Sequence, residues 1–95
     1  MQTDTQRIEE QRARIVALDS TLDSKRTPFL KRQLLSASHR LDDATDALRY
    51  AEKAHSTKDA AMWRGFAETN IQAAVQFCQK VQEAVELDLK AKELA

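Results

Sequence analysis

A run of cations without any acid is the feature of this sequence with the clearest chemical potential. Residues 24–41 contain no Asp or Glu, although an Asp borders the run on either side. The cations of the run are Lys25, Arg26, Lys31, Arg32 and Arg40, joined by His39. Pro28 suits the first position of a helix, with Thr27 as its N-cap. Backbone N–H groups at a helix N-terminus already favour an anion, so added cations predict a phosphate-bearing ligand; the alternative is solvated side chains at a bend.

Catalysis and metal binding have little support in the residue pattern. His39 and His55 have no neighbours at metal-ligand spacing, and no activated nucleophile can be assembled from the residue types present. Arg49 and His55 resemble the Arg-x5-His pair of some helical ribonucleases, but Tyr50 follows the arginine where those enzymes carry a polar residue. We therefore expect no enzyme activity, no metal site and no cofactor.

Composition indicates one small all-α domain. The chain has 95 residues with one glycine and one proline, and it is rich in good helix formers. Its fifteen basic and fifteen acidic side chains cancel, which argues against binding to double-stranded nucleic acid through net charge. Cys78, the single cysteine, can form no disulfide within one chain, and no apolar run approaches the roughly 18 residues of a membrane span. We expect one domain, residues 1–95, in the cytoplasm and without a membrane partner.

Hydrophobic spacing predicts three long helices. The first should run from about Asp4 to Asp23 on a narrow apolar stripe. The second begins at Pro28, and its apolar residues alternate steps of four and three without a break. They are Leu30, Leu34, Ala37, Leu41, Ala44, Leu48 and Ala51. The third should run from about Lys58 to Leu94 on a broad apolar face. That face consists of Trp63, Phe66, Ala67, Ile71, Ala74, Phe77, Cys78, Val81, Val85 and Leu89.

The tripeptide Trp63-Arg64-Gly65 resembles the Trp-x-Gly turn of a family of small secreted helical-hairpin proteins. Ser56 and Asp59 predict instead that the third helix begins several residues earlier, with the serine as its N-cap. The tripeptide should therefore be helical. Gly65 is then interpreted as a position of close packing, because glycine inside a helix costs about 1 kcal/mol relative to alanine.

A short connection at residues 54–57 predicts that the second and third helices form an antiparallel hairpin. Counting from the turn predicts these neighbours: Leu48 with Trp63 and Phe66, Leu41 with Asn70 and Ile71, Leu34 with Phe77 and Cys78, and Leu30 with Val81. Beyond this point the third helix has no partner left in the hairpin, yet its apolar residues continue with Val85, Leu87, Leu89 and Leu94. We expect a second copy of the chain to cover them in a homo-oligomeric helical bundle. The sequence does not indicate on which side of the hairpin the first helix packs.

One local pattern resembles a known family. Trp63, Phe66, Ala67, Thr69, Ile71, Gln72 and Ala74 are similar in order and spacing to the second hairpin helix of phage-encoded sponges that sequester cyclic nucleotide messengers of CBASS defence. The resemblance covers a hairpin from about Leu34 to Val81. It implies a small helical homo-oligomer, usually a hexamer, that binds cyclic di- or trinucleotides between protomers without cleaving them. The long charged first helix and the tail after Val85 depart from the family.

We therefore predict an anti-defence binding protein that sequesters a phosphate-bearing cyclic nucleotide, in the host cytoplasm if the chain is phage-encoded. The predicted ligand-binding residues at the corner between the first two helices are Lys25, Arg26, Thr27, Lys31 and Arg32. A second predicted group on the third helix consists of Arg64, Thr69 and Asn70, with Trp63 as either a core residue or a base-stacking platform. The alternative is a helical oligomeric adaptor or structural protein that binds a partner protein through exposed apolar seams.

Overall fold

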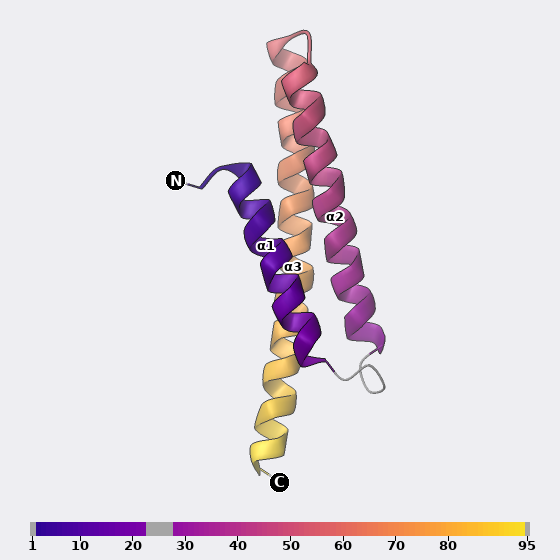
Figure 1. Cartoon of the computed structure of the whole chain (residues 1–95), viewed down its shortest axis with the longest axis vertical. Helices are drawn as coiled ribbons and strands as arrows, with labels where there is room; N and C mark the ends of the chain where they lie inside the picture. The colour runs from indigo at the N-terminus through magenta and orange to yellow at the C-terminus, as the bar shows by residue number, and fades with distance from the viewer. Residues whose placement is uncertain (1, 23–27, 95) are drawn as a thin grey trace.

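The computed structural model describes residues 2–22 and 28–94, with side chains described as far as Ala91. Within these ranges it contains three α-helices and no strand: α1 Asp4–Thr21, α2 Pro28–Lys53 and α3 Thr57–Leu94. Helices α2 and α3 form an antiparallel hairpin, and α1 lies along one side of it against both (Figure 1). The molecule is elongated, with extents of 59 × 27 × 15 Å. The prediction of an all-α fold with a hairpin of the last two helices is confirmed.

Local capping fixes where two of the helices begin. The backbone N–H of Gln6 donates to the Thr3 side chain over 3.1 Å, and the Thr3 N–H donates to the Gln6 side chain over 2.9 Å, which makes a complete capping box for α1. At the start of α3 the Asp59 N–H donates to Ser56 Oγ over 3.0 Å, so the predicted serine N-cap is confirmed. The end of α1, at Thr21, comes two residues earlier than the sequence predicted.

The core follows the seam between α2 and α3. Its largest fully buried side chains are Leu41, Ile71, Val81 and Cys78. The small residues of the seam, Ala37, Ala44, Ala67 and Ala74, have no exposed surface, which lets the two backbones approach closely. The predicted register holds at the middle of the hairpin, because the Arg40 side chain, one residue before Leu41, reaches Asn70.

Two predictions about α3 are wrong. Phe66, expected on the core face, has 52% of its surface exposed. The core face of α3 is narrow, and Ala67 and Ile71 occupy it. Phe66 precedes Ala67 and is rotated from it by about 100° around the helix, so its side chain lies outside this face. Gly65 was expected to allow close packing, but a Cβ built there meets nothing within 4 Å. It lies instead on the exposed side of α3.

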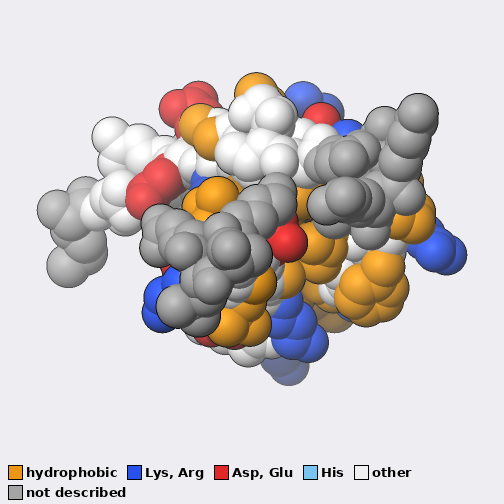
Figure 2. Space-filling view, turned by 90° about the horizontal axis from the view of Figure 1, so that it is seen from below, with side chains coloured by type: hydrophobic (Ala, Val, Ile, Leu, Met, Phe, Trp, Pro, Cys, Tyr) orange, Lys and Arg blue, Asp and Glu red, His pale blue; other side chains and the backbone are white. Residues whose placement is uncertain are grey.

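The lower end of α3 extends past the start of α2 and the end of α1 (Figure 1). Val85 is half-buried there, while Leu87 and Leu89 are 67% and 55% exposed. Seen from this end, hydrophobic side chains form patches on the molecular surface (Figure 2). The side chain of Leu94 lies outside the described residues. None of the described helices combines the length and low polarity that crossing a membrane requires.

Candidate ligand-binding site

The predicted site at the corner between α1 and α2 lies only partly within the described chain. Lys25, Arg26 and Thr27 fall outside the described residues. Lys31 is described, and its Nζ lies 3.1 Å from Asp19 Oδ1 on α1, so this cation already has an anionic partner. The Arg32 side chain is exposed. An anion at this corner therefore stays a prediction.

The second predicted group, Arg64, Thr69 and Asn70, is not gathered into one site. Arg64 lines a shallow hollow at the hairpin tip together with His55. Thr69 is exposed, and its hydroxyl donates to the Gly65 carbonyl of its own helix over 3.1 Å. Asn70 lines a different hollow, a groove between α2 and α3. Neighbouring helical positions differ by about 100°, so residues this close in sequence face different surroundings.

The groove beside Asn70 is the most aromatic surface among the described residues. It encloses about 450 Å³ on the face of the hairpin that α1 leaves uncovered. Its lining residues are Arg40, Asp43, Asp46, Ala47, Tyr50, Trp63, Phe66 and Asn70. The Tyr50 and Trp63 ring centroids are 4.8 Å apart, and those of Trp63 and Phe66 are 5.7 Å apart. We call this surface the aromatic groove. The predicted core or platform residue Trp63 is half-buried between its two neighbours.

Polar groups along one side give the aromatic groove a mixed character. Arg40 Nη1 donates to Asn70 Oδ1 over 3.2 Å, and Asn70 Nδ2 donates to the Phe66 carbonyl over 3.0 Å. A guanidinium has five N–H donors, so four of them on Arg40 are not used by this bond. Asp43 and Asp46 add carboxylates at the same groove. The arrangement offers ring faces for a flat group, donors for an anion and acceptors for amino groups.

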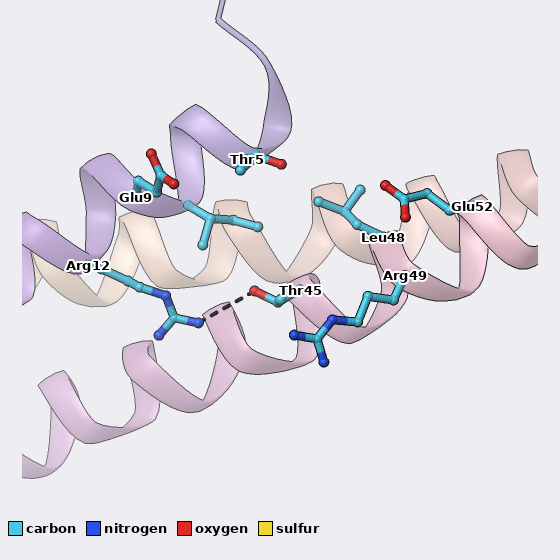
Figure 3. Close-up of a pocket in the computed structure, with 8 residues that line it drawn as sticks. Thr5, Glu9, Arg12, Thr45, Leu48, Arg49 and Glu52 are labelled. Atoms are coloured by element: carbon cyan, nitrogen blue, oxygen red, sulfur yellow. Dashed lines mark hydrogen bonds between the residues drawn. The ribbon is translucent and has the colours of Figure 1, made fainter.

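A second pocket, of about 390 Å³, lies between α1 and α2 (Figure 3). It contains two arginines and two glutamates: Arg12, Arg49, Glu9 and Glu52. The Arg12 guanidinium is held by Asp42 over 2.9 Å and by Thr45 over 3.4 Å. The charges of this pocket balance, and none of the described residues that line it carries an aromatic ring on which a base could stack.

Arg49 and His55, the pair with ribonuclease-like spacing, line different hollows. Within the described residues no three or more His, Cys, Asp or Glu side chains are arranged to hold a metal ion. Burial raises the pKa of the Cys78 thiol, with a smaller opposing effect from the Arg14 guanidinium. A buried thiol with a raised pKa is a poor nucleophile, as expected for a structural cysteine.

The sequence does not predict the aromatic groove, although the residues of one wall share a helical spacing. On α2 the residues Arg40, Asp43, Ala47 and Tyr50 recur at steps of three and four, beside the main apolar seam. The sequence groups Arg40 with the corner cations, and it shows Tyr50 as the residue that follows Arg49. Such a spacing occurs on every side of a helix, so it identifies these residues as neighbours but not as the wall of a groove.

Comparison of the chain with models of known protein families, with curated proteins and with solved structures gives no match.

Proposed function

We propose that this chain is a non-catalytic binding protein that sequesters a phosphate-bearing cyclic oligonucleotide. The observation that carries the proposal is the aromatic groove, where three ring systems lie beside an arginine and an asparagine. Tyr50 and Phe66 are 54% and 52% exposed, so their rings are accessible to a ligand. Exposed rings next to a partly unused guanidinium suit a ligand that is both flat and anionic.

The local resemblance to cyclic nucleotide sponges supports the same part of the molecule. Trp63 and Phe66 belong both to the resembling pattern on α3 and to the wall of the aromatic groove. Asn70, which belongs to the second predicted group of ligand residues, lines the groove as well. The two arguments share Trp63 and Phe66, but one rests on residue order and the other on exposure and ring contacts.

The chemistry of the aromatic groove assigns different parts of a nucleotide to different residues. A nucleobase would stack on the exposed rings of Tyr50 and Phe66, where each base contact is worth about 1–3 kcal/mol. A phosphate would lie against Arg40, which can contact two oxygens at once. The carboxylates of Asp43 and Asp46 repel phosphate but accept hydrogen bonds from the amino groups of a base. The ligand should therefore lie with its phosphates away from these two aspartates.

Isothermal titration of a panel of cyclic di- and trinucleotides into the wild type and two variants tests the assignment. Arg40→Ala should weaken binding by about tenfold or more, since a charge-assisted hydrogen bond contributes about 1.5–3 kcal/mol. Lys53→Ala is the matched control, because it removes an exposed cation of the same helix that does not line the groove. Equal binding by wild type and Arg40→Ala would remove the groove from the site.

The corner between α1 and α2 is the second place where the ligand could bind. Its prediction rests on the sequence, with Arg32 as the exposed cation within the described residues. The double variant Arg26→Ala, Arg32→Ala therefore belongs in the same titration. A loss of about tenfold in the double variant with unchanged binding in Arg40→Ala would assign the nucleotide to the corner instead.

A second candidate function is that of a helical adaptor or structural protein. The observation in its favour is a set of exposed large apolar side chains away from the aromatic groove: Val16, Phe29, Leu35, Leu87 and Leu89. Apolar side chains in patches are typical of surfaces that bind another protein. A wild type that binds none of the nucleotides in the panel would favour this function over the first.

A further inference from the structure

α1 packs on the hairpin with few buried apolar side chains, whereas α2 and α3 pack through a long buried seam. The seam of the hairpin consists of buried side chains, from Ala51 near the tip to Leu34 and Val81. In α1 the single buried residue is Ile8, while Ile15 and Leu18 are half-buried against the core. The apolar contribution to holding α1 is therefore small compared with that within the hairpin.

Two arginines of α1 supply its hydrogen bonds to α3. The Arg7 guanidinium binds both carboxylate oxygens of Glu68, with Nη2 donating to Oε1 over 3.1 Å. Glu68 is itself oriented by Gln72, which donates to it over 2.9 Å. Two turns further along α1, Arg14 donates to the Gln79 side chain over 2.9 Å and also reaches Gln82. These bonds anchor one edge of α1 on the third helix.

Two ion pairs supply polar contacts between α1 and α2. Arg12 lies 2.9 Å from Asp42, and Asp19 lies 3.1 Å from Lys31. The side chains of these pairs keep between 34% and 58% of their surface exposed. Because their charges are in contact with water, salt screens them, whereas it does not weaken the buried apolar seam.

We propose that α1 is a releasable cover, which undocks from the α2–α3 hairpin as a unit while the hairpin stays folded, and whose docking weakens as ionic strength rises. An 18-residue helix is only marginally stable by itself in water, so release of α1 also unwinds it. The hairpin keeps its seam and loses from the core the contacts of Ile8, Ile15 and Leu18. The chain then has two states, with α1 docked or released. The released state exposes apolar surface of the hairpin on the face opposite the aromatic groove.

Cys78 reports on the release from within the core. It has no exposed surface, it belongs to the same core cluster as Ile8 of α1, and the next residue, Gln79, binds the Arg14 guanidinium of α1. Undocking of α1 removes one side of the cover over this thiol. Its rate of alkylation should therefore follow the docking of α1, although the cysteine has no role in the release itself.

Native-state hydrogen exchange of the full chain, at about 50 mM and at about 500 mM salt, tests the proposal. Amides of α1 should exchange at least about tenfold faster than those at the centres of α2 and α3, and only the α1 amides should speed up at high salt. Alkylation of Cys78 should speed up in parallel. If amides of all three helices exchange through one common opening at both salt concentrations, α1 and the hairpin are one cooperative unit and the proposal is overturned.

A charge swap tests whether the contact between Arg7 and Glu68 holds α1 on the hairpin. Arg7→Glu should speed up exchange in α1 further, because it sets two like charges against each other, and adding Glu68→Arg should restore slow exchange. Asp46→Asn is the matched control, since it removes an exposed pair with Arg49 that lies wholly within α2. Failure of the double variant to restore slow exchange would show that the Arg7–Glu68 contact does not hold α1.

Discussion

Gly65 shows how a single residue can be misread from sequence. Glycine inside a helix commonly marks a close approach of another backbone, and the predicted helical position of Gly65 led to that interpretation. The space around its Cα is open. Periodicity identifies which face a residue occupies, but it does not identify whether that face is covered, and here the face is exposed.

Gly65→Ala should stabilise the protein by about 0.5–1 kcal/mol. The added methyl group meets no atom within 4 Å, and alanine loses less backbone entropy than glycine when the helix forms. Thermal unfolding followed by circular dichroism should show a midpoint higher by about 2–8 °C for a domain of this size. An unchanged or lower midpoint would mean that something packs against this face in solution.

Leu41 is the opposite case, because its burial was predicted correctly from the four-three repeat. It has no exposed surface and lies at the middle of the seam between α2 and α3. Leu41→Ala should lower the free energy of unfolding by roughly 2–5 kcal/mol, as for other buried leucines. Urea denaturation measures the loss, and a value below about 1 kcal/mol would contradict the observed packing.

At the scale of the elements, the sequence predicted most of what positions the helices. The Pro28 start of α2, the Ser56 cap of α3 and the register of the hairpin all follow from local chemistry and spacing. The docking of α1 was not predictable, because it depends on long arginine side chains that reach partners 30 to 68 residues away in the chain. Charged residues on a helix surface carry no signal for their distant partner.

The contact of Arg7 with Glu68 gives the docking of α1 a defined pH dependence. Hydrogen bonds from Arg7, and then from Gln72, lower the pKa of Glu68 below its ordinary value of 4.5. A carboxylate with a lowered pKa in the folded state contributes stability above its unfolded pKa and loses it as the pH falls through the folded one. The contribution is therefore complete above about pH 4.5 and is lost on further acidification.

Glu68→Gln tests this dependence against the background of the other carboxylates. Between about pH 6 and pH 3.5 the thermal midpoint of the wild type should fall by more than that of the variant, because only the wild type has this carboxylate to protonate. Circular dichroism at the two pH values measures the difference. Equal falls in both proteins would mean that Glu68 contributes nothing to the acid sensitivity.

At the scale of the whole molecule, several large apolar side chains are left uncovered by its own helices. Leu87 and Leu89 lie on the part of α3 that extends beyond the hairpin, and the aromatic groove remains open on the other side from α1. A chain of 95 residues has little surface to spare for such patches unless they bind something. The sequence predicted the overhang of α3 but not the groove, since the groove exists only where residues of α2 and α3 come together.

We predict that the protein self-associates at micromolar concentration. Sedimentation velocity should show a species larger than the 10.8 kDa chain. The double variant Leu87→Gln, Leu89→Gln should shift the population toward the monomer, because it replaces exposed apolar side chains of the overhang with polar ones. A wild type that sediments as a clean monomer would contradict the expected homo-oligomer.

The central claim is that the protein holds a cyclic oligonucleotide and leaves it intact. The most direct measurement incubates the wild type with each cyclic di- and trinucleotide, removes unbound ligand, denatures the protein with heat and identifies the released nucleotide by chromatography. The account predicts that at least one of them is retained and recovered as the unaltered cyclic compound. Retention of none, or recovery of linear products whose formation is lost in His55→Ala, would contradict it.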